Sequence, residues 1–123
     1  MKLKGAVLFT LFAGLAFVLN PFSINARGGL EIGATVENFS LTDTDGAATS
    51  LNGLKGKNGT LVVWLSAQCP VVKGYKDRIN EIAAAYRAKG IAFVGINSNA
   101  TEDLNWVKSN KAEFGYNFPV LID

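Results

Sequence analysis

The residue in this chain best suited to redox chemistry is its single cysteine, Cys69, which lies in the run Ser66-Ala67-Gln68-Cys69-Pro70. Lys73 follows it at a distance of about one helical turn. A cysteine reacts as its thiolate, which is also the form that peroxides oxidise, and a helix start or a nearby cation favours that form. The alternative is a buried cysteine that acts only as a small apolar side chain. Which of the two applies depends on where the surrounding elements place the sulfur.

Two apolar runs and an amphipathic segment surround Cys69. Leu61–Leu65 and Ile91–Ile96 are continuous apolar runs, which are typical of buried parallel strands. Pro70 suits the first position of a helix, because its missing N–H has no partner there. A helical stripe of apolar residues follows, at Val72, Tyr75, Ile79, Ile82 and Tyr86. These elements predict a parallel strand–helix–strand unit, with Cys69 between the carboxyl end of the first strand and the helix N-terminus.

That position predicts roles for the neighbours of Cys69. In open parallel sheets chemistry is found at the carboxyl ends of strands, and a helix N-terminus stabilises an anion. We expect Cys69 to be the nucleophile, with Pro70 starting the helix and Lys73 adding a positive charge on the same side. Ser66 is expected either to donate a hydrogen bond to the sulfur or to cap the helix.

Upstream of this unit the sequence predicts a β-hairpin. The signal is an alternating apolar pattern with a tight-turn dipeptide, over Phe39, Leu41, Asp45-Gly46 and Thr49–Leu51. The tryptophans Trp64 and Trp106 are expected to be core and helix-packing residues rather than a platform for a ligand.

The C-terminal part predicts a second helix and a last extended segment. Thr101 is expected to cap the helix, with Glu102 and Asp103 in its first turn and Gly115 at its end. Phe118–Ile122 begins another extended segment, and an apolar strand in this position needs a strand to pair with and a layer to cover it. We therefore expect an unpaired apolar edge and a domain that is incomplete at its C-terminus.

The N-terminal segment has the layout of a secretory signal peptide over residues 1–26. Lys2 and Lys4 precede an apolar run from Gly5 to Leu19, and a small residue stands at position 26. The run is shorter than the ~20 residues that a helix needs to cross the hydrocarbon core, so no stable membrane span is expected. The alternative is an uncleaved anchor. We expect an exported protein with one domain over residues 27–123.

Composition excludes several function classes. Without residues 1–26 the chain has ten basic and ten acidic residues, so nothing indicates a surface for nucleic acid. The chain has no histidine and one cysteine, so a metal site built from imidazole and thiolate is not expected. No cofactor is predicted.

The chain resembles the thioredoxin-like redoxins allied to the alkyl hydroperoxide reductase/thiol-specific antioxidant (peroxiredoxin-like) family. The similarity covers Ile32 to Asp123 and rests on the hairpin and on three stretches, Leu61–Lys73, Phe93–Asn99 and Phe118–Val120. The resemblance implies an α/β, thioredoxin-like fold with an N-terminal β-hairpin plus a βαβ unit. It also implies that the distal ββα half, with its cis-proline loop, is missing from this chain.

The departures from the family pattern qualify the expected chemistry. Ser66 stands where the resemblance places the second cysteine of a dithiol thioredoxin, and Val62 stands where peroxiredoxins have a proline. The resemblance implies a one-cysteine, thiol-dependent oxidoreductase. Its substrate is a small peroxide or a disulfide partner protein, with peroxide favoured because Ser66 replaces the resolving cysteine, and an external thiol is the reductant. The alternative is a non-catalytic redoxin-fold binding module, or an inactive fragment of a longer redoxin.

Overall fold

The computed structural model describes residues 29–123. The predicted signal peptide, residues 1–26, lies outside the described residues. The chain divides into two units, residues 1–35 and 36–123. The described part of the first unit holds one turn, in which the Ala34 N–H donates to the carbonyl of Glu31 at 3.0 Å. No helix within the described residues combines the length and the apolar character needed to cross a membrane.

The second unit is built on a five-stranded mixed sheet with the strand order β2-β1-β5-β4-β3. The strands β1 and β2 form an antiparallel hairpin, whereas β3, β4 and β5 run parallel to one another. The hairpin turn contains Gly46 at φ 85°, a left-handed conformation that glycine adopts without strain. The predicted hairpin and the predicted parallel unit are both confirmed. The strand bounds are Ser40–Asp43 (β1), Ala48–Ser50 (β2), Gly59–Trp64 (β3), Ile91–Asn97 (β4) and Val120–Ile122 (β5).

The helix predicted after Cys69 is divided in two. Its parts are α2 (Pro70–Gly74) and α3 (Lys76–Arg87), and Tyr75 between them has φ −100° and ψ 2°. Gly74, a poor helix former, immediately precedes the break. The two tyrosines of the predicted apolar stripe are not buried: Tyr75, at the break, is 61% exposed and Tyr86 is 37% exposed. The other helices are η1 (Asn52–Leu54) and α4 (Leu104–Glu113).

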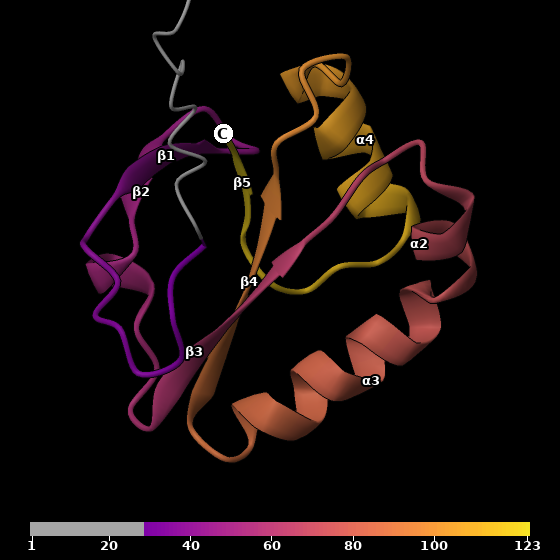
Figure 1. Ribbon diagram of the computed structural model, residues 1–123. Helices are drawn as coiled ribbons and strands as arrows, with labels where there is room; N and C mark the ends of the chain where they lie inside the picture. The colour runs from indigo at the N-terminus through magenta and orange to yellow at the C-terminus, as the bar shows by residue number, and fades with distance from the viewer. Residues whose placement is uncertain (1–28) are drawn as a thin grey trace, which may run out of the picture. The chain divides into compact units, whose positions relative to one another are not determined.

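Both long helices cover the same face of the sheet (Figure 1). The path β3, β4, β5 moves in one direction across the sheet, and right-handed crossovers then place α3 and α4 on one side. The core on that side combines residues of both helices with the sheet, at Leu65, Ala83, Phe93, Val107, Phe114, Tyr116, Phe118 and Val120. The other face packs against the hairpin and η1, through Phe39, Leu41, Leu54, Val62, Val94, Ile96 and Leu121.

The last strand is central in the sheet, so the expectation of an unpaired edge at Phe118–Ile122 was wrong. β5 pairs with β4 on one side and with β1 on the other. Val120 and Leu121 are 2% and 0% exposed. The partner β1 lies about eighty residues earlier in the chain, where a local pattern cannot reveal it. Within the described residues β3 pairs with β4 alone and is one of the two edges of the sheet.

Candidate active site

Cys69 lies where the sequence predicted, between the end of a buried parallel strand and the start of a helix. β3 ends at Trp64, and the Leu65 N–H extends the ladder by donating to the Ile96 carbonyl at 2.8 Å. Cys69 is the N-cap residue of α2, with Pro70 in the first turn. Its carbonyl accepts from the Lys73 N–H at 3.0 Å, while no side chain caps this helix. The start of α2 is therefore free of any competing side-chain acceptor.

The thiol of Cys69 is free and half-buried, and it lines an open groove, here called the cysteine groove. It therefore differs from a core cysteine enclosed by aliphatic side chains. The groove is lined by Trp64, Leu65, Ser66, Cys69, Val72, Ser98, Asn99 and Ala100. The expectation that Trp64 and Trp106 are core residues was wrong, because they are 66% and 45% exposed. Trp64 ends an edge strand, which leaves one side of it without a neighbouring strand.

Ser66 shares the cysteine groove with Cys69, but its hydroxyl has a different partner from those predicted. It donates to Oε1 of Glu102 at 2.6 Å. A hydroxyl has one proton to donate, so the Ser66 proton is not available to the sulfur, and Ser66 does not cap α2. Its carbonyl accepts from the Cys69 N–H at 3.4 Å and so closes the turn that leads into the helix.

The other two predicted site residues lie outside the cysteine groove. Pro70 occupies the first turn of α2, as expected. Lys73 is in the last turn of α2 and exposed, and its ammonium makes no hydrogen bond or ion pair with the described part of the chain. The structure thus brings Cys69 and Ser66 together, with Lys73 one helical turn further along.

The functional candidate that sequence reasoning missed is Glu102. Its side chain comes from the loop between β4 and α4 and is only 4% exposed. Burial opposes ionisation, but hydrogen bonds from Ser66, Asn97 and the loop backbone outweigh it and lower the pKa of Glu102 to about 2. The carboxylate accepts five hydrogen bonds, from Ser66 Oγ (2.6 Å), the N–H groups of Ala67 (2.7 Å) and Gln68 (3.1 Å), Asn97 Nδ2 (2.6 Å) and Asn99 Nδ2 (3.0 Å).

The start of α4 explains why Glu102 was misplaced. The N-cap is Asp103, whose carboxylate accepts from the Trp106 N–H at 2.8 Å, so the prediction of a cap at Thr101 was wrong. Thr101 instead accepts a hydrogen bond from Gln68 Nε2 at 2.9 Å. Glu102 thus precedes the helix rather than lying in its first turn. A signal was present in the sequence, because amide side chains at positions 97 and 99 offer donors beside this carboxylate at the end of a parallel strand.

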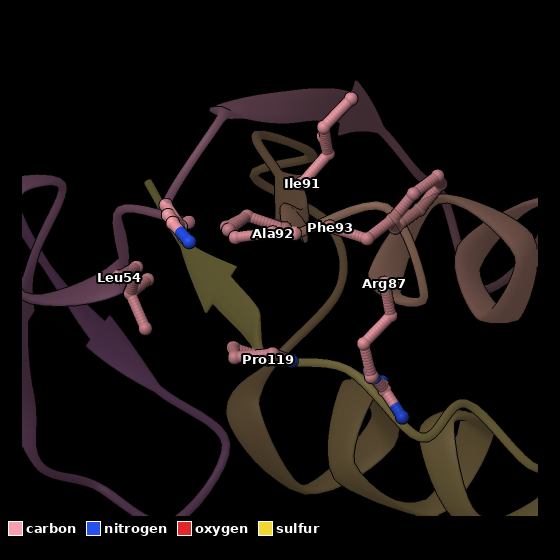
Figure 2. Close-up of a pocket in the computed structure, with 10 residues that line it drawn as sticks. Leu54, Arg87, Ile91, Ala92, Phe93 and Pro119 are labelled. Carbon is pink, nitrogen blue, oxygen red and sulfur yellow. The ribbon is translucent and has the colours of Figure 1, made fainter.

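A second hollow lies away from the cysteine groove, at the start of β4 (Figure 2). Leu54, Ala92 and Pro119 line it, with Arg87 at its rim. The Arg87 guanidinium donates to the carbonyl and the side chain of Asn117, at 2.5 and 3.1 Å, and so has protein partners already. None of the predicted site residues lines this hollow.

Comparison with known proteins identifies relatives whose names describe thiol redox chemistry. The Redoxin family matches residues 31–123. The thiol-disulfide oxidoreductase ResA of Bacillus thuringiensis (strain Al Hakam) is 31% identical over 121 residues, which are 98% of this chain and 64% of the relative. A more distant relative is the chloroplastic phospholipid hydroperoxide glutathione peroxidase 1 of Arabidopsis thaliana, 28% identical over 70% of this chain and 35% of that protein.

Solved structures agree on the fold. A secreted disulfide oxidoreductase of Mycobacterium tuberculosis, described as homologous to E. coli DsbE, superimposes with a TM-score of 0.59 at 27% identity. The match covers 69% of this chain and 60% of that structure. The predicted α/β thioredoxin-like fold is therefore confirmed, in the form of a five-stranded mixed sheet. The chain spans 64% of the length of the curated relatives it matches first.

Proposed function

We propose that this chain, which belongs to the Redoxin family, is a thiol–disulfide oxidoreductase that works through Cys69. The observation that carries the proposal is a free, half-buried thiol at an uncapped helix start, in an open groove. The relatives named as thiol-disulfide oxidoreductases support this choice of chemistry. Helix starts favour the thiolate, which is the attacking species in disulfide exchange.

The proposed reaction proceeds through a mixed disulfide. The Cys69 thiolate attacks one sulfur of a partner disulfide, forming a new S–S bond, and the other sulfur leaves as a thiolate. The chain has a single cysteine, so an external thiol must complete the cycle. That thiol, as its thiolate, attacks the mixed disulfide, forms a disulfide with the partner sulfur and releases the Cys69 thiolate.

The surroundings of Cys69 favour a disulfide in a partner protein as the substrate. Trp64 and Val72 line the same groove, and Trp64 is 66% exposed. Val71, which follows Pro70 in α2, is 64% exposed. Exposed apolar side chains beside a reactive group are typical of surfaces that contact another polypeptide. Lys73 adds a positive charge one turn after the sulfur and is assigned a supporting role.

The test compares the purified chain with its Cys69→Ser variant. Reduction of a protein disulfide by dithiothreitol would be followed at increasing concentrations of each protein. We expect the wild type to accelerate the reaction and Cys69→Ser to leave the uncatalysed rate unchanged. Ser109→Ala, on the exposed side of α4, is the control for a serine change elsewhere and should match the wild type. Equal rates with the wild type and Cys69→Ser would contradict the proposal.

A second candidate reaction is peroxide reduction by the same sulfur. The peroxidase relative and the absence of a second cysteine in the sequence favour it. The Cys69 thiolate would attack the O–O bond, take one oxygen as a sulfenic acid and release an alkoxide or hydroxide, which takes up a proton. One external thiol then forms a mixed disulfide with loss of water, and a second releases Cys69. Peroxide consumption that is equal in the wild type and in Cys69→Ser would exclude this reaction.

The alternative to both reactions is a non-catalytic redoxin-fold module, or an inactive fragment of a longer redoxin. A folded wild type that accelerates neither reaction above the Cys69→Ser background would favour this alternative. The genomic sequence downstream of codon 123 separates its two forms, because an in-frame continuation would assign the activity to a longer product.

We also propose that the protein is exported, with residues 1–26 as its signal peptide. The N-terminal charge and apolar pattern supports this, as does the structural relative described as secreted. Expression of the full chain in a bacterium, followed by N-terminal sequencing of the periplasmic form, tests it. We expect a mature protein that begins at Arg27, and full-length protein retained in the cytoplasm would contradict export.

A further inference from the structure

We propose that Glu102 is a positioning residue for the thiol reaction of Cys69, an inference that rests on the proposed function. The juxtaposition that carries it is a buried carboxylate bonded to each of the three residues that precede Cys69. Glu102 is remote from Cys69 in sequence, and it acts through the loop rather than by touching the reacting sulfur.

A chain of hydrogen bonds connects the Glu102 carboxylate to the backbone of Cys69. The carboxylate fixes the Ser66 hydroxyl and the N–H groups of Ala67 and Gln68, at 2.6 to 3.1 Å. The Ser66 carbonyl in turn accepts from the Cys69 N–H at 3.4 Å. The position of Cys69 at the start of α2 is thus set by a turn that Glu102 holds.

The Glu102 carboxylate is itself held by two amide side chains. Asn97, the last residue of β4, donates to Oε2 of Glu102 at 2.6 Å and is 2% exposed. Asn99 donates to Oε1 at 3.0 Å, and its own N–H donates to the side chain of Asn97 at 3.0 Å. A cluster of hydrogen bonds to the Glu102 carboxylate therefore connects the loop before Cys69 to the end of β4. These hydrogen bonds are charge-assisted and are stronger than neutral ones.

The cluster has another consequence for the chemistry. The N–H groups of Ala67 and Gln68 point at Glu102, so they are not free to rearrange around the sulfur as the reaction proceeds. Without the carboxylate, these donors and the Ser66 hydroxyl, which are partly withdrawn from solvent, would lose their partner, which favours a rearranged loop. A rearranged loop would move Cys69 away from its position at the start of α2 and in the cysteine groove.

The test measures the reaction of Cys69 with a small neutral disulfide, 2,2′-dipyridyl disulfide, at pH 7. The reaction is a single thiol modification, so it requires no turnover. We expect Glu102→Ala to slow it at least tenfold, and Glu102→Asp, which keeps both acceptor oxygens on a shorter stem, to recover part of the loss. Glu113→Gln, a charge removal at an exposed position of α4, is the control and should react like the wild type.

Two further measurements separate positioning from general stability. Circular dichroism establishes that each variant is folded under the assay conditions, and amide hydrogen exchange follows the N–H groups of Ala67 and Gln68. Positioning predicts faster exchange at these two amides together with the slower thiol reaction. A folded Glu102→Ala that reacts within twofold of the wild type, or faster than it, would overturn the proposal.

If Glu102→Ala does not fold, Ser66→Ala takes its place, because it removes one of the five hydrogen bonds and no charge. We expect a reaction about threefold slower, and an unchanged rate would overturn the proposal.

Failure of this positioning proposal can be distinguished from failure of the proposed function. A wild type that reduces no protein disulfide would contradict the function, whereas the thiol modification of the variants would still report on positioning.

Discussion

Two loops meet at the carboxyl ends of the parallel strands, and they prepare their helices in opposite ways. The loop 98–103 follows β4, and its last residue, Asp103, caps α4 by accepting from the Trp106 N–H at 2.8 Å. The loop 65–69 follows β3 and ends at Cys69, which starts α2 without any side-chain cap. Loop 98–103 thus provides the side-chain cap of its own helix, whereas loop 65–69 provides none and places the Cys69 sulfur at the helix start.

The difference shows how a fold can leave a helix start uncapped without destabilising the loop before it. Three donors in loop 65–69, the Ser66 hydroxyl and the N–H groups of Ala67 and Gln68, are satisfied by Glu102, which the loop 98–103 supplies. Buried polar groups need partners, and here those partners come from the other strand–helix connection rather than from the helix itself. Cys69 occupies the N-cap position of α2, and its side chain makes no capping hydrogen bond.

The largest expected effect is the loss of Glu102. Its pKa of about 2 in the folded protein lies below its ordinary value of 4.5, so the carboxylate contributes stability that is fully present above pH 4.5 and is lost as the pH falls toward 2. We expect this contribution to be on the order of 3 kcal/mol. Chemical denaturation of the wild type and Glu102→Gln at pH 7 and pH 2.5 measures it.

The expected pattern is a large difference between the two proteins at pH 7 that shrinks in acid. Glu113→Gln, the same substitution at an exposed site on α4, should follow the wild type at both pH values. A Glu102→Gln variant with the same acid dependence as the wild type would show that the carboxylate does not link the two loops.

A smaller effect is expected for the cap of α4. Asp103→Ala removes the acceptor of the Trp106 N–H and should lower the free energy of unfolding by about 1 kcal/mol. Thermal unfolding of the two proteins side by side measures it. Asp103→Asn, which can still accept that hydrogen bond, should recover most of the loss, and equal losses in both variants would argue against capping.

The smallest effect is expected at the uncapped helix. Cys69 has φ −72° and ψ 117°, which is extended backbone suited to an N-cap residue. Cys69→Ser therefore supplies a capping oxygen and should raise the free energy of unfolding by roughly 0.5 kcal/mol while abolishing activity. Denaturation under reducing conditions measures it, with Cys69→Ala as the comparison. A serine variant less stable than the alanine variant would contradict an open cap at this position.

The sequence was sufficient to predict the strand end and helix start at Cys69 and the hairpin turn, whose signals are local. Pro70 and the apolar run before it placed Cys69 at a strand end and a helix start, and Asp45-Gly46 placed the hairpin turn, as the structure has them. The central position of β5 depends on pairing with β1, a partner far away in sequence. No periodicity within either segment encodes that pairing.

The candidate site also has a part that the sequence predicted and a part that depends on contacts between distant segments. Cys69 was recognisable from its residue type and position, whereas the hydroxyl of Ser66 was assigned the wrong partner. Glu102 was read as a first-turn helix residue because Thr101 and Asp103 are both acceptable caps, and propensity alone does not choose between them. The choice is made by tertiary contacts, since burying Glu102 against loop 65–69 requires the helix to start after it.

The central claim is that the Cys69 thiolate forms a covalent bond to a partner sulfur. The most direct measurement is the intact mass of the chain after brief exposure to a disulfide and acid quenching. We predict one mixed disulfide, located at Cys69 by peptide mapping and removed when an excess of external thiol is added before quenching. A folded wild type that remains unmodified under conditions in which a free cysteine reacts would contradict the claim.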